Sequence, residues 1–237
     1  MKLYEAAYST TLPPKSPIIV RCDGRAFHTY TRRANKPWDD EVQNAMQCAL
    51  FTLCRDVSGA RFGYQQSDEI TLILCDWADF NSEHYFGGKT QKLTSVISSQ
   101  VTNAFNKSIN PDIWGFAEFD CRVFSVPHHE IKNVFIWRQQ DATRNSVQCL
   151  GQKYFSHHEL HQKSIKQIKL MLSECHDIVW DQCPTKFKHG ISCYKPRELA
   201  VPESRGTSGS PWLLDVETPI FSSPDAHDFI TKHLPEP

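Results

Sequence analysis

Two short acidic motifs contain the residue types in this chain that are best suited to chemistry. Each lies at one end of an apolar run: Asp23 and Gly24 follow residues 18–20, and Ser67-Asp68-Glu69 precedes residues 70–74. Carboxylates on neighbouring strands can hold a pair of Mg²⁺ ions, which clamp a nucleoside triphosphate and activate an attacking hydroxyl. Asp23 and Asp68 are therefore predicted to form a metal site for nucleotidyl transfer.

The segment between these two aspartates is long enough for the helix and the strand that would bring them together. Gly24 lets a phosphate approach the main chain closely, and the amides that follow, from Arg25 to His28, could cradle a triphosphate. The alternative is that Asp-Gly and Ser-Asp are turn signals only. Either dipeptide alone would be weak, but both together at strand ends favour metal binding.

Apolar periodicity predicts an α+β fold for residues 1–130. Strands are expected over 18–22, 60–65, 69–75 and 119–126, and helices over 39–58 and 89–107. Asp39 or Asp40 is expected to cap the first of these helices. The order β-α-β-β-α-β is that of a ferredoxin-like palm domain, an antiparallel sheet with helices on one face. Polymerases and cyclases share this architecture.

The character of the sequence changes after residue 130. Helices are expected over 130–155 and 159–174, a strand over 187–194, a loop over 203–211 and an edge strand over 212–220. We interpret residues 1–130 as a palm-like catalytic domain and residues 131–237 as a helical and β extension. The two are expected to pack together as one structural unit.

Composition limits the class of protein. The 237 residues are 40% hydrophobic and 22% charged, which is ordinary for a globular protein. No apolar run approaches the roughly 20 residues that cross a bilayer, so no membrane association is expected. The nine cysteines show no close pairs, which predicts free thiols and a cytoplasmic location.

The charge of the chain is unevenly distributed. The net charge of −1 excludes a basic nucleic-acid coat, but residues 132–169 hold seven basic and two acidic side chains, a local charge of +5. This stripe could meet phosphates or could be a solvated helix face, and the sequence leaves both interpretations open. Residues 83–90 approach a P-loop, but Glu83 replaces its first glycine, so we reject that motif.

Five ordered motifs resemble the tRNA-histidine guanylyltransferase family. They are Arg-x-Asp-Gly-Arg-x-Phe-His, Lys-Pro, Gly-Tyr-x-Gln-Ser-Asp-Glu, Phe-Asp-x-Arg-Val and Trp-Arg-Gln-x-Asp, at residues 21–28, 36–37, 63–69, 119–123 and 137–141. The resemblance covers most of the first 145 residues. It implies an enzyme that extends the 5′ end of a tRNA in the 3′-to-5′ direction, after ATP has activated the 5′-phosphate.

The resemblance also implies the residues of the site. Asp23, the Gly24 carbonyl and Asp68 match the ligands of two Mg²⁺ ions, and Glu69 has a supporting catalytic role. The nucleotide pocket, for ATP and for GTP or another nucleoside triphosphate, is expected at Asp23, Gly24, Arg25, Ala26, Phe27, His28, Lys36, Ser67 and Asp68. Contacts to RNA or triphosphate are expected at Lys89, Lys92, Arg122, Arg138 and Asn145. A homo-oligomer, a tetramer, is implied as well.

One segment departs from the family pattern. The guanylyltransferases proper continue Asp-Cys-His-Ile-Asn-Asn after Trp-Arg-Gln-Ala, whereas this chain has Thr143 for the histidine and Ser146 for an asparagine. The change favours the bacterial, archaeal and phage branch, whose members repair truncated tRNA 5′ ends by template pairing. The alternatives are addition of a single G to histidine tRNA, a palm-domain nucleotide cyclase, and a catalytically silent RNA-binding protein.

Overall fold

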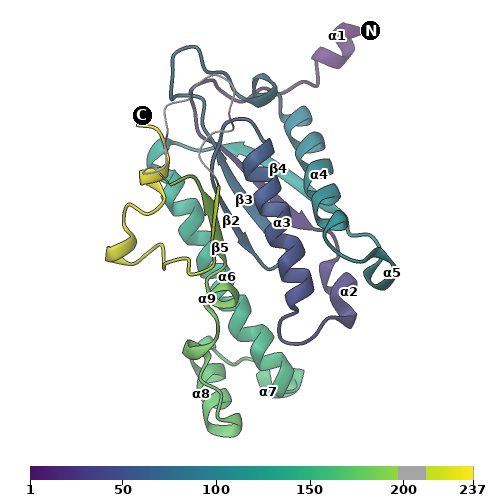
Figure 1. Cartoon of the computed structure of the whole chain (residues 1–237), viewed down its shortest axis with the longest axis vertical. Helices are drawn as coiled ribbons and strands as arrows, with labels where there is room; N and C mark the ends of the chain where they lie inside the picture. Colours follow the sequence, from purple (N-terminus) through teal and green to yellow (C-terminus); the bar gives the residue numbers. More distant parts are fainter. Residues whose placement is uncertain (197–211, 237) are drawn as a thin grey trace.

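The structure is a computed structural model that describes residues 1–196 and 212–236. Its centre is a six-stranded antiparallel sheet in the order β4-β1-β3-β2-β5-β6 (Figure 1). The strands are β1 (Ile18–Gly24), β2 (Ala60–Gln66), β3 (Glu69–Leu74), β4 (Phe119–Ser125), β5 (Ile191–Tyr194) and β6 (Leu213–Asp215). The four strands expected before residue 130 are confirmed, and two strands from the C-terminal part extend the same sheet.

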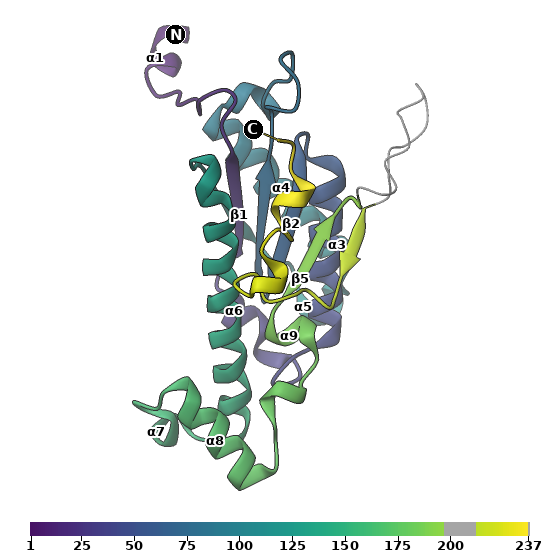
Figure 2. The same cartoon turned by 90° about the vertical axis from the view of Figure 1, so that its left-hand side faces the viewer.

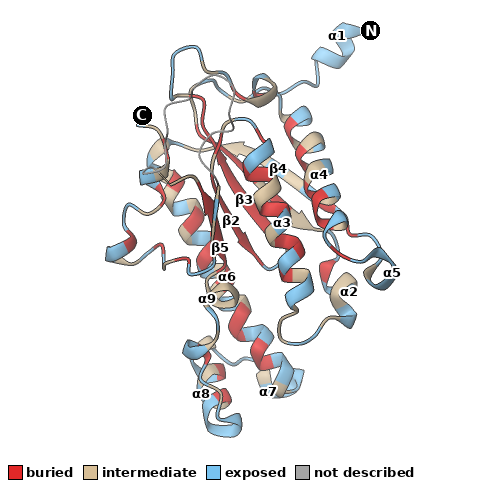
Figure 3. Ribbon diagram, in the orientation of Figure 1, coloured by how far each residue is buried: buried red, intermediate tan, exposed pale blue. Residues whose placement is uncertain are grey.

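Helices α3 (Asp40–Asp56) and α4 (Thr90–Lys107) cover one face of the sheet, as predicted. The carboxylate of Asp39 accepts hydrogen bonds from the amides of Glu41 and Val42, which satisfies the free donors at the start of α3. Alternate residues of β1, including Val20 and Cys22, face these helices in the larger hydrophobic core. Figure 3 shows buried residues along the strands and on the inward sides of both helices.

The opposite face of the sheet is covered by α6 (Ile131–Tyr154) and by the C-terminal segment, which adds a layer to the predicted palm (Figure 2). The strand residues that alternate with those of the larger core point to this face and form a second hydrophobic core, in which Ile19, Phe62 and Ile73 pack with Phe135. Because these strands are apolar on both sides, a sheet with helices on one face alone would leave this surface in water.

Helix α6 continues beyond the sheet to a small helical tip. There α7 (His157–Leu160) and α8 (Ile165–His176) pack with the end of α6 around a third hydrophobic cluster that contains Trp180. The helix predicted over 159–174 is two helices, because Ser164 caps a new helix through a capping box with Gln167. Lys163 and Lys166 lie exposed on this tip.

The remaining differences fall in the C-terminal part. Residues 185–188 form the short helix α9 (Thr185–Lys188), so the strand expected from Phe187 begins only at Ile191. Gly190, at φ +76°, makes the turn between them. The edge strand is limited to residues 213–215, and the loop expected over 203–211 lies outside the described residues.

Short helices complete the described chain. They are α1 (Lys2–Ala6), α2 (Phe27–Tyr30), α5 (Pro111–Trp114), η1 (Thr31–Arg33), η2 (Tyr85–Gly88), η3 (His128–Glu130), η4 (Trp180–Gln182), η6 (Pro224–Ala226) and η7 (Thr231–His233). Among the helices of the described ranges, none combines the length and the apolar character needed to cross a bilayer.

Candidate active site

The end of β1 meets the turn between β2 and β3, and this contact brings the two acidic motifs together. The amide of Gly24 donates a hydrogen bond to the main-chain oxygen of Asp68 over 3.2 Å. A Cβ atom added at Gly24 would lie 3.0 Å from Asp68 Oδ2 and 2.3 Å from the ring of Phe27. The glycine is therefore required by space, and the Asp68 carboxylate lies directly beside it.

Both aspartates resist ionisation in this environment. Burial raises the pKa of Asp68 to about 6, and the nearby negative charge of Asp23 adds to the rise. Burial is also the main cause that raises the pKa of Asp23. The negative charge of Asp120, which lies opposite Asp23 on β4, raises it further. Like charges held this close favour a cation between them, because its charge would offset their repulsion.

The residues present fit Mg²⁺. The two carboxylates and the Gly24 carbonyl are hard oxygen donors, and a side chain at position 24 would fill the space beside Asp68. Within residues 1–196 and 212–236, no group of three or more His, Cys, Asp or Glu side chains is arranged so that it could hold a metal ion by itself. Mg²⁺ commonly takes one or two carboxylates and completes its shell with water and substrate phosphates, so two carboxylates are sufficient.

Glu69 lies opposite Asp23 on β3 and anchors α6 to the sheet. Arg138 Nε donates to Glu69 Oε1 over 2.7 Å, and its Nη2 donates to Asp141 Oδ2 over 2.8 Å. Both Glu69 and Arg138 are buried. Burial raises the pKa of Glu69, and the guanidinium of Arg138 opposes that rise. Arg138 thus fixes α6 beside Asp68, and its guanidinium is enclosed rather than presented to a ligand.

A second group of charged residues lies on the same face of the sheet. Arg122 is exposed on β4 and pairs with Asp120 over 3.4 Å. Arg21 approaches Glu69 over 3.9 Å and lies against the ring of Trp137, 5.7 Å from its centroid. This surface is next to Asp23 and carries cations that an anionic ligand could meet.

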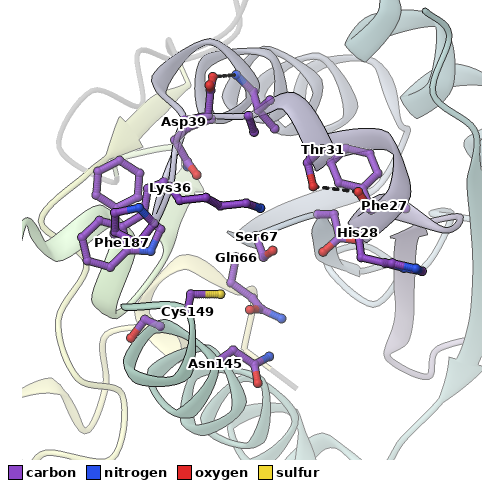
Figure 4. A pocket seen from close by; sticks show the side chains of 18 of the residues that line it. Phe27, His28, Thr31, Lys36, Asp39, Gln66, Ser67, Asn145, Cys149 and Phe187 are labelled. Carbon is purple, nitrogen blue, oxygen red and sulfur yellow. Dashed lines mark hydrogen bonds between the residues drawn. The ribbon is translucent and has the colours of Figure 1, made fainter. Parts of the chain in front are cut away.

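A cavity of about 510 Å³ opens next to the Ser67–Asp68 turn (Figure 4). Its walls come from α2 and the segment after it, the first turns of α3, the β2–β3 turn, one side of α6, and the region of α9. The lining residues are Gly24, Ala26, Phe27, His28, Thr31, Ala34, Asn35, Lys36, Pro37, Trp38, Asp39, Val42, Gln43, Gln66, Ser67, Asp68, Ala142, Asn145, Ser146, Cys149, Gln152, Lys186, Phe187 and Gly190.

Most of the nucleotide-binding residues expected from the sequence line this cavity. In Figure 4 the side chain of Lys36 extends into it above Ser67, and among the described residues no carboxylate pairs with its ammonium. Two expected residues are not part of the lining. Asp23 lies on the α6 side of the sheet, and Arg25 is exposed and ion-paired with Glu118.

The residues expected to contact RNA or triphosphate are dispersed. Asn145 lines the cavity from α6, whereas Arg122 lies on β4 and Arg138 is buried. Lys89 forms an isolated β-bridge with Thr11, in the segment before β1, and Lys92 lies in the first turn of α4. Neither lysine lines the cavity.

Several lining residues were not identified from the sequence. The rings of Trp38 and Phe187 stack with centroids 4.7 Å apart and planes at 4°, at the mouth of the cavity. Cys149 and Gln43 face it from α6 and α3. The cavity stripe on α6 has helical spacing and was detectable in principle, but nothing in the sequence relates Trp38 to Phe187.

Comparison with known proteins gives consistent matches. The family model for tRNAHis guanylyltransferase (Thg1) matches residues 1–127. The chain is 32% identical over 218 residues to protein R259 of Acanthamoeba polyphaga mimivirus, which covers 81% of this chain and 74% of that protein. It is 30% identical over 139 residues to the probable tRNA(His) guanylyltransferase of Dictyostelium discoideum, covering 55% and 52% of the two chains.

Solved structures extend the likeness beyond the part matched by the family model. A bacterial tRNA(His) guanylyltransferase (Thg1)-like protein in complex with ATP superposes with a TM-score of 0.89 and 34% identity, covering 98% of this chain and 96% of that chain. One in complex with GTP superposes with a TM-score of 0.79 and 33% identity. The resemblance found in the five sequence motifs is confirmed, and the chain belongs to the tRNAHis guanylyltransferase (Thg1) family of nucleotidyltransferases.

Proposed function

We propose that this protein is a template-dependent 3′-to-5′ nucleotidyltransferase that repairs the 5′ ends of tRNA, after ATP has activated the 5′-phosphate. The observation that supports it best is the cavity beside Asp68, which combines oxygen donors for a metal with Lys36, a lysine that pairs with no described carboxylate. The bacterial Thg1-like relatives in complex with ATP and with GTP share this fold over 98% of the chain, which supports nucleoside triphosphates as the ligands.

The main chain around Gly24 is suited to phosphate. Ala26 has a left-handed conformation, with φ +49°, and the amides of Ala26, Phe27 and His28 form no main-chain hydrogen bond with any other described residue. These amides and the Lys36 ammonium would bind the triphosphate oxygens. Asp23, Asp68 and the Gly24 carbonyl would hold two Mg²⁺ ions, which neutralise phosphate charge and lower the barrier to in-line attack.

The residues that depart from the family pattern have internal partners. Thr143 Oγ1 donates to the carbonyl of Lys188 over 3.3 Å, and Ser146 Oγ accepts from Trp180 Nε1 over 3.1 Å. Both positions therefore hold α6 against the segment that precedes β5. This use in packing supports an enzyme that selects nucleotides by pairing with a template, rather than one that reads histidine tRNA at this segment.

Binding of tRNA is assigned to the exposed basic residues of the helical tip. Arg138 and Arg144 are paired with acidic side chains, and Lys169 lies 3.2 Å from Asp181. Lys163 and Lys166 form no ion pair with any described residue and remain available to phosphates. We also propose, from the family resemblance, that the protein assembles as a tetramer, which light scattering of the purified chain would test.

The test is nucleotide addition to a panel of 5′-labelled tRNAs that lack one or more 5′ nucleotides. Addition that follows the opposing base is expected for every truncated tRNA. Asp23→Ala and Asp68→Ala should abolish addition, whereas the matched change Asp56→Ala, at the exposed end of α3, should not. Addition of a single G to histidine tRNA alone would refute repair, and a cyclic product from nucleoside triphosphate without RNA would indicate a cyclase.

A further inference from the structure

Two buried glutamine side chains connect α3 with the turn that carries Asp68. Gln43 Nε2 donates to Gln65 Oε1 over 2.7 Å, and Gln65 Nε2 donates to the main-chain oxygen of Ser67 over 2.7 Å. Gln65 is fully buried and Gln43 is 8% exposed. The two bonds therefore run from the first turns of the helix, through β2, into the candidate metal-binding turn.

The turn itself needs support. Ser67 has φ +49°, a left-handed conformation that costs free energy in a residue other than glycine. The hydrogen bond from Gln65 fixes the carbonyl of Ser67, which belongs to the peptide group that joins Ser67 to Asp68. The orientation of the Asp68 carboxylate thus depends on a peptide that the side chain of Gln65 holds in place.

Burial of Gln65 has no packing reason. Its neighbours across the sheet are Ile70 on β3 and Ile191 on β5, and an apolar side chain would suit that setting better. A buried amide is tolerated because it is hydrogen-bonded at both ends. The Ser67 carbonyl can only accept, so the Gln65 nitrogen must face it, and Gln43 then donates to the Gln65 oxygen that is left on the α3 side.

We infer that Gln65, supported by the hydrogen bond from Gln43, is a positioning residue that holds the Ser67–Asp68 turn in the conformation that binds the divalent cation. The inference rests on the proposed function, since it concerns the same metal site. Gln43 also lines the cavity, so one hydrogen-bonded chain joins the wall of the nucleotide cavity to the metal ligand. Supporting hydrogen bonds of this kind typically change metal affinity by about 10- to 100-fold.

The experiment measures Mn²⁺ binding by electron paramagnetic resonance, without RNA and without turnover. Gln65→Glu keeps the size of the side chain and the acceptor for Gln43, but its carboxylate cannot donate to Ser67. Gln65→Leu removes both bonds. We expect the Mn²⁺ dissociation constant to rise by about 10- to 100-fold in both variants. Gln43→Leu, which leaves the bond from Gln65 to Ser67 but removes the donor to the Gln65 oxygen, should give a smaller rise.

Gln139→Leu is the matched control. Gln139 is also buried, and it makes hydrogen bonds to His189, Pro219 and Phe221, none of which belongs to the Ser67–Asp68 turn. Gln139→Leu should lower thermal stability and leave the Mn²⁺ affinity unchanged. If Gln65 only contributed to folding, the Gln65 and Gln139 variants would show the same Mn²⁺ affinity. Nucleotide addition by Gln65→Glu should need about tenfold or more Mg²⁺ for half-maximal rate and recover at saturating Mg²⁺.

The inference would be overturned if both Gln65 variants bound Mn²⁺ as tightly as the wild type. It would also be overturned if Gln139→Leu lost as much Mn²⁺ affinity as the Gln65 variants. If Gln65→Leu does not fold, Gln65→Glu and Gln43→Leu carry the test. Absence of Mn²⁺ binding by the wild-type protein would instead refute the proposed metal site. The failure of the proposed function and that of the positioning role are therefore distinguishable.

Discussion

Replacement of Asp68 by asparagine should stabilise the metal-free protein. The pKa of Asp68 is about 6 in the folded chain, above its ordinary value of 3.8, so the folded state binds this proton more tightly than the unfolded state. Stability from this group is therefore fully present below about pH 4 and is lost as pH rises through 6. At pH 7.5 the wild type has lost that contribution, and Asp68→Asn removes the buried charge that is responsible.

The magnitude follows from the size of the shift. A rise of about two pKa units corresponds to about 3 kcal/mol, since each unit is worth about 1.4 kcal/mol. Asp68 retains partial contact with solvent, which reduces the effect. We therefore expect Asp68→Asn to raise the free energy of unfolding by about 1–3 kcal/mol at pH 7.5, and by almost nothing near pH 4.

Urea unfolding at the two pH values, with a metal chelator present, measures this effect. Asp56→Asn is the control, because a hydrogen bond from Arg55 lowers the pKa of Asp56 and the sign of its contribution is opposite. Addition of Mg²⁺ should stabilise the wild type and leave Asp68→Asn unchanged. A variant that is no more stable than the wild type at pH 7.5 would refute the assigned burial and charge of Asp68.

Four further outcomes are expected. The Mn²⁺ dissociation constant should rise as pH falls below about 6, where Asp68 takes up its proton, and an affinity that stays constant from about pH 5 to 8 would contradict this. Gly24→Ala should weaken Mn²⁺ binding in the same resonance assay and cost about 1–3 kcal/mol in urea unfolding, because its methyl group would collide with a neighbouring ring. Arg138→Leu should lower stability by about 3–5 kcal/mol, because the buried Glu69 loses its hydrogen-bonded partner and keeps only the more distant Arg21, and the double variant with Glu69→Leu should recover most of that loss. The affinity for tRNA should fall as salt rises, and Lys166→Ala should reduce the slope in a filter-binding titration; a flat salt response would remove the tip from the interface.

The catalytic sheet was predictable because its signals are local. The alternation of β1, the cap at Asp39 and the apolar spacing of α3 each determine one element from neighbouring residues. The sequence also shows that the strands are apolar on both sides, since Ile19 and Ile73 are as apolar as their neighbours along each strand. The predicted palm nevertheless had helices on one face only, so the position of α6 over the other face was not predicted.

The site was predictable only where its residues come from motifs. Gly24, Lys36 and Asp68 line one cavity because the turn and the end of β1 are adjacent in the sheet. Contacts that depend on the path of α6 and of the chain after it were not accessible. The burial of Arg138 and the stacking of Trp38 on Phe187 are examples, because each joins elements distant in sequence.

Helix α6 has one further consequence. It runs without a break from the sheet, past the cavity, to the tip, so its three contacts lie on a single stiff rod. From Asn145 in the cavity wall to Tyr154 at the far end, the rise is about 14 Å. A ligand bound at the helical tip is therefore held at a fixed distance from the cavity. Lengthening α6 by one turn would increase that distance.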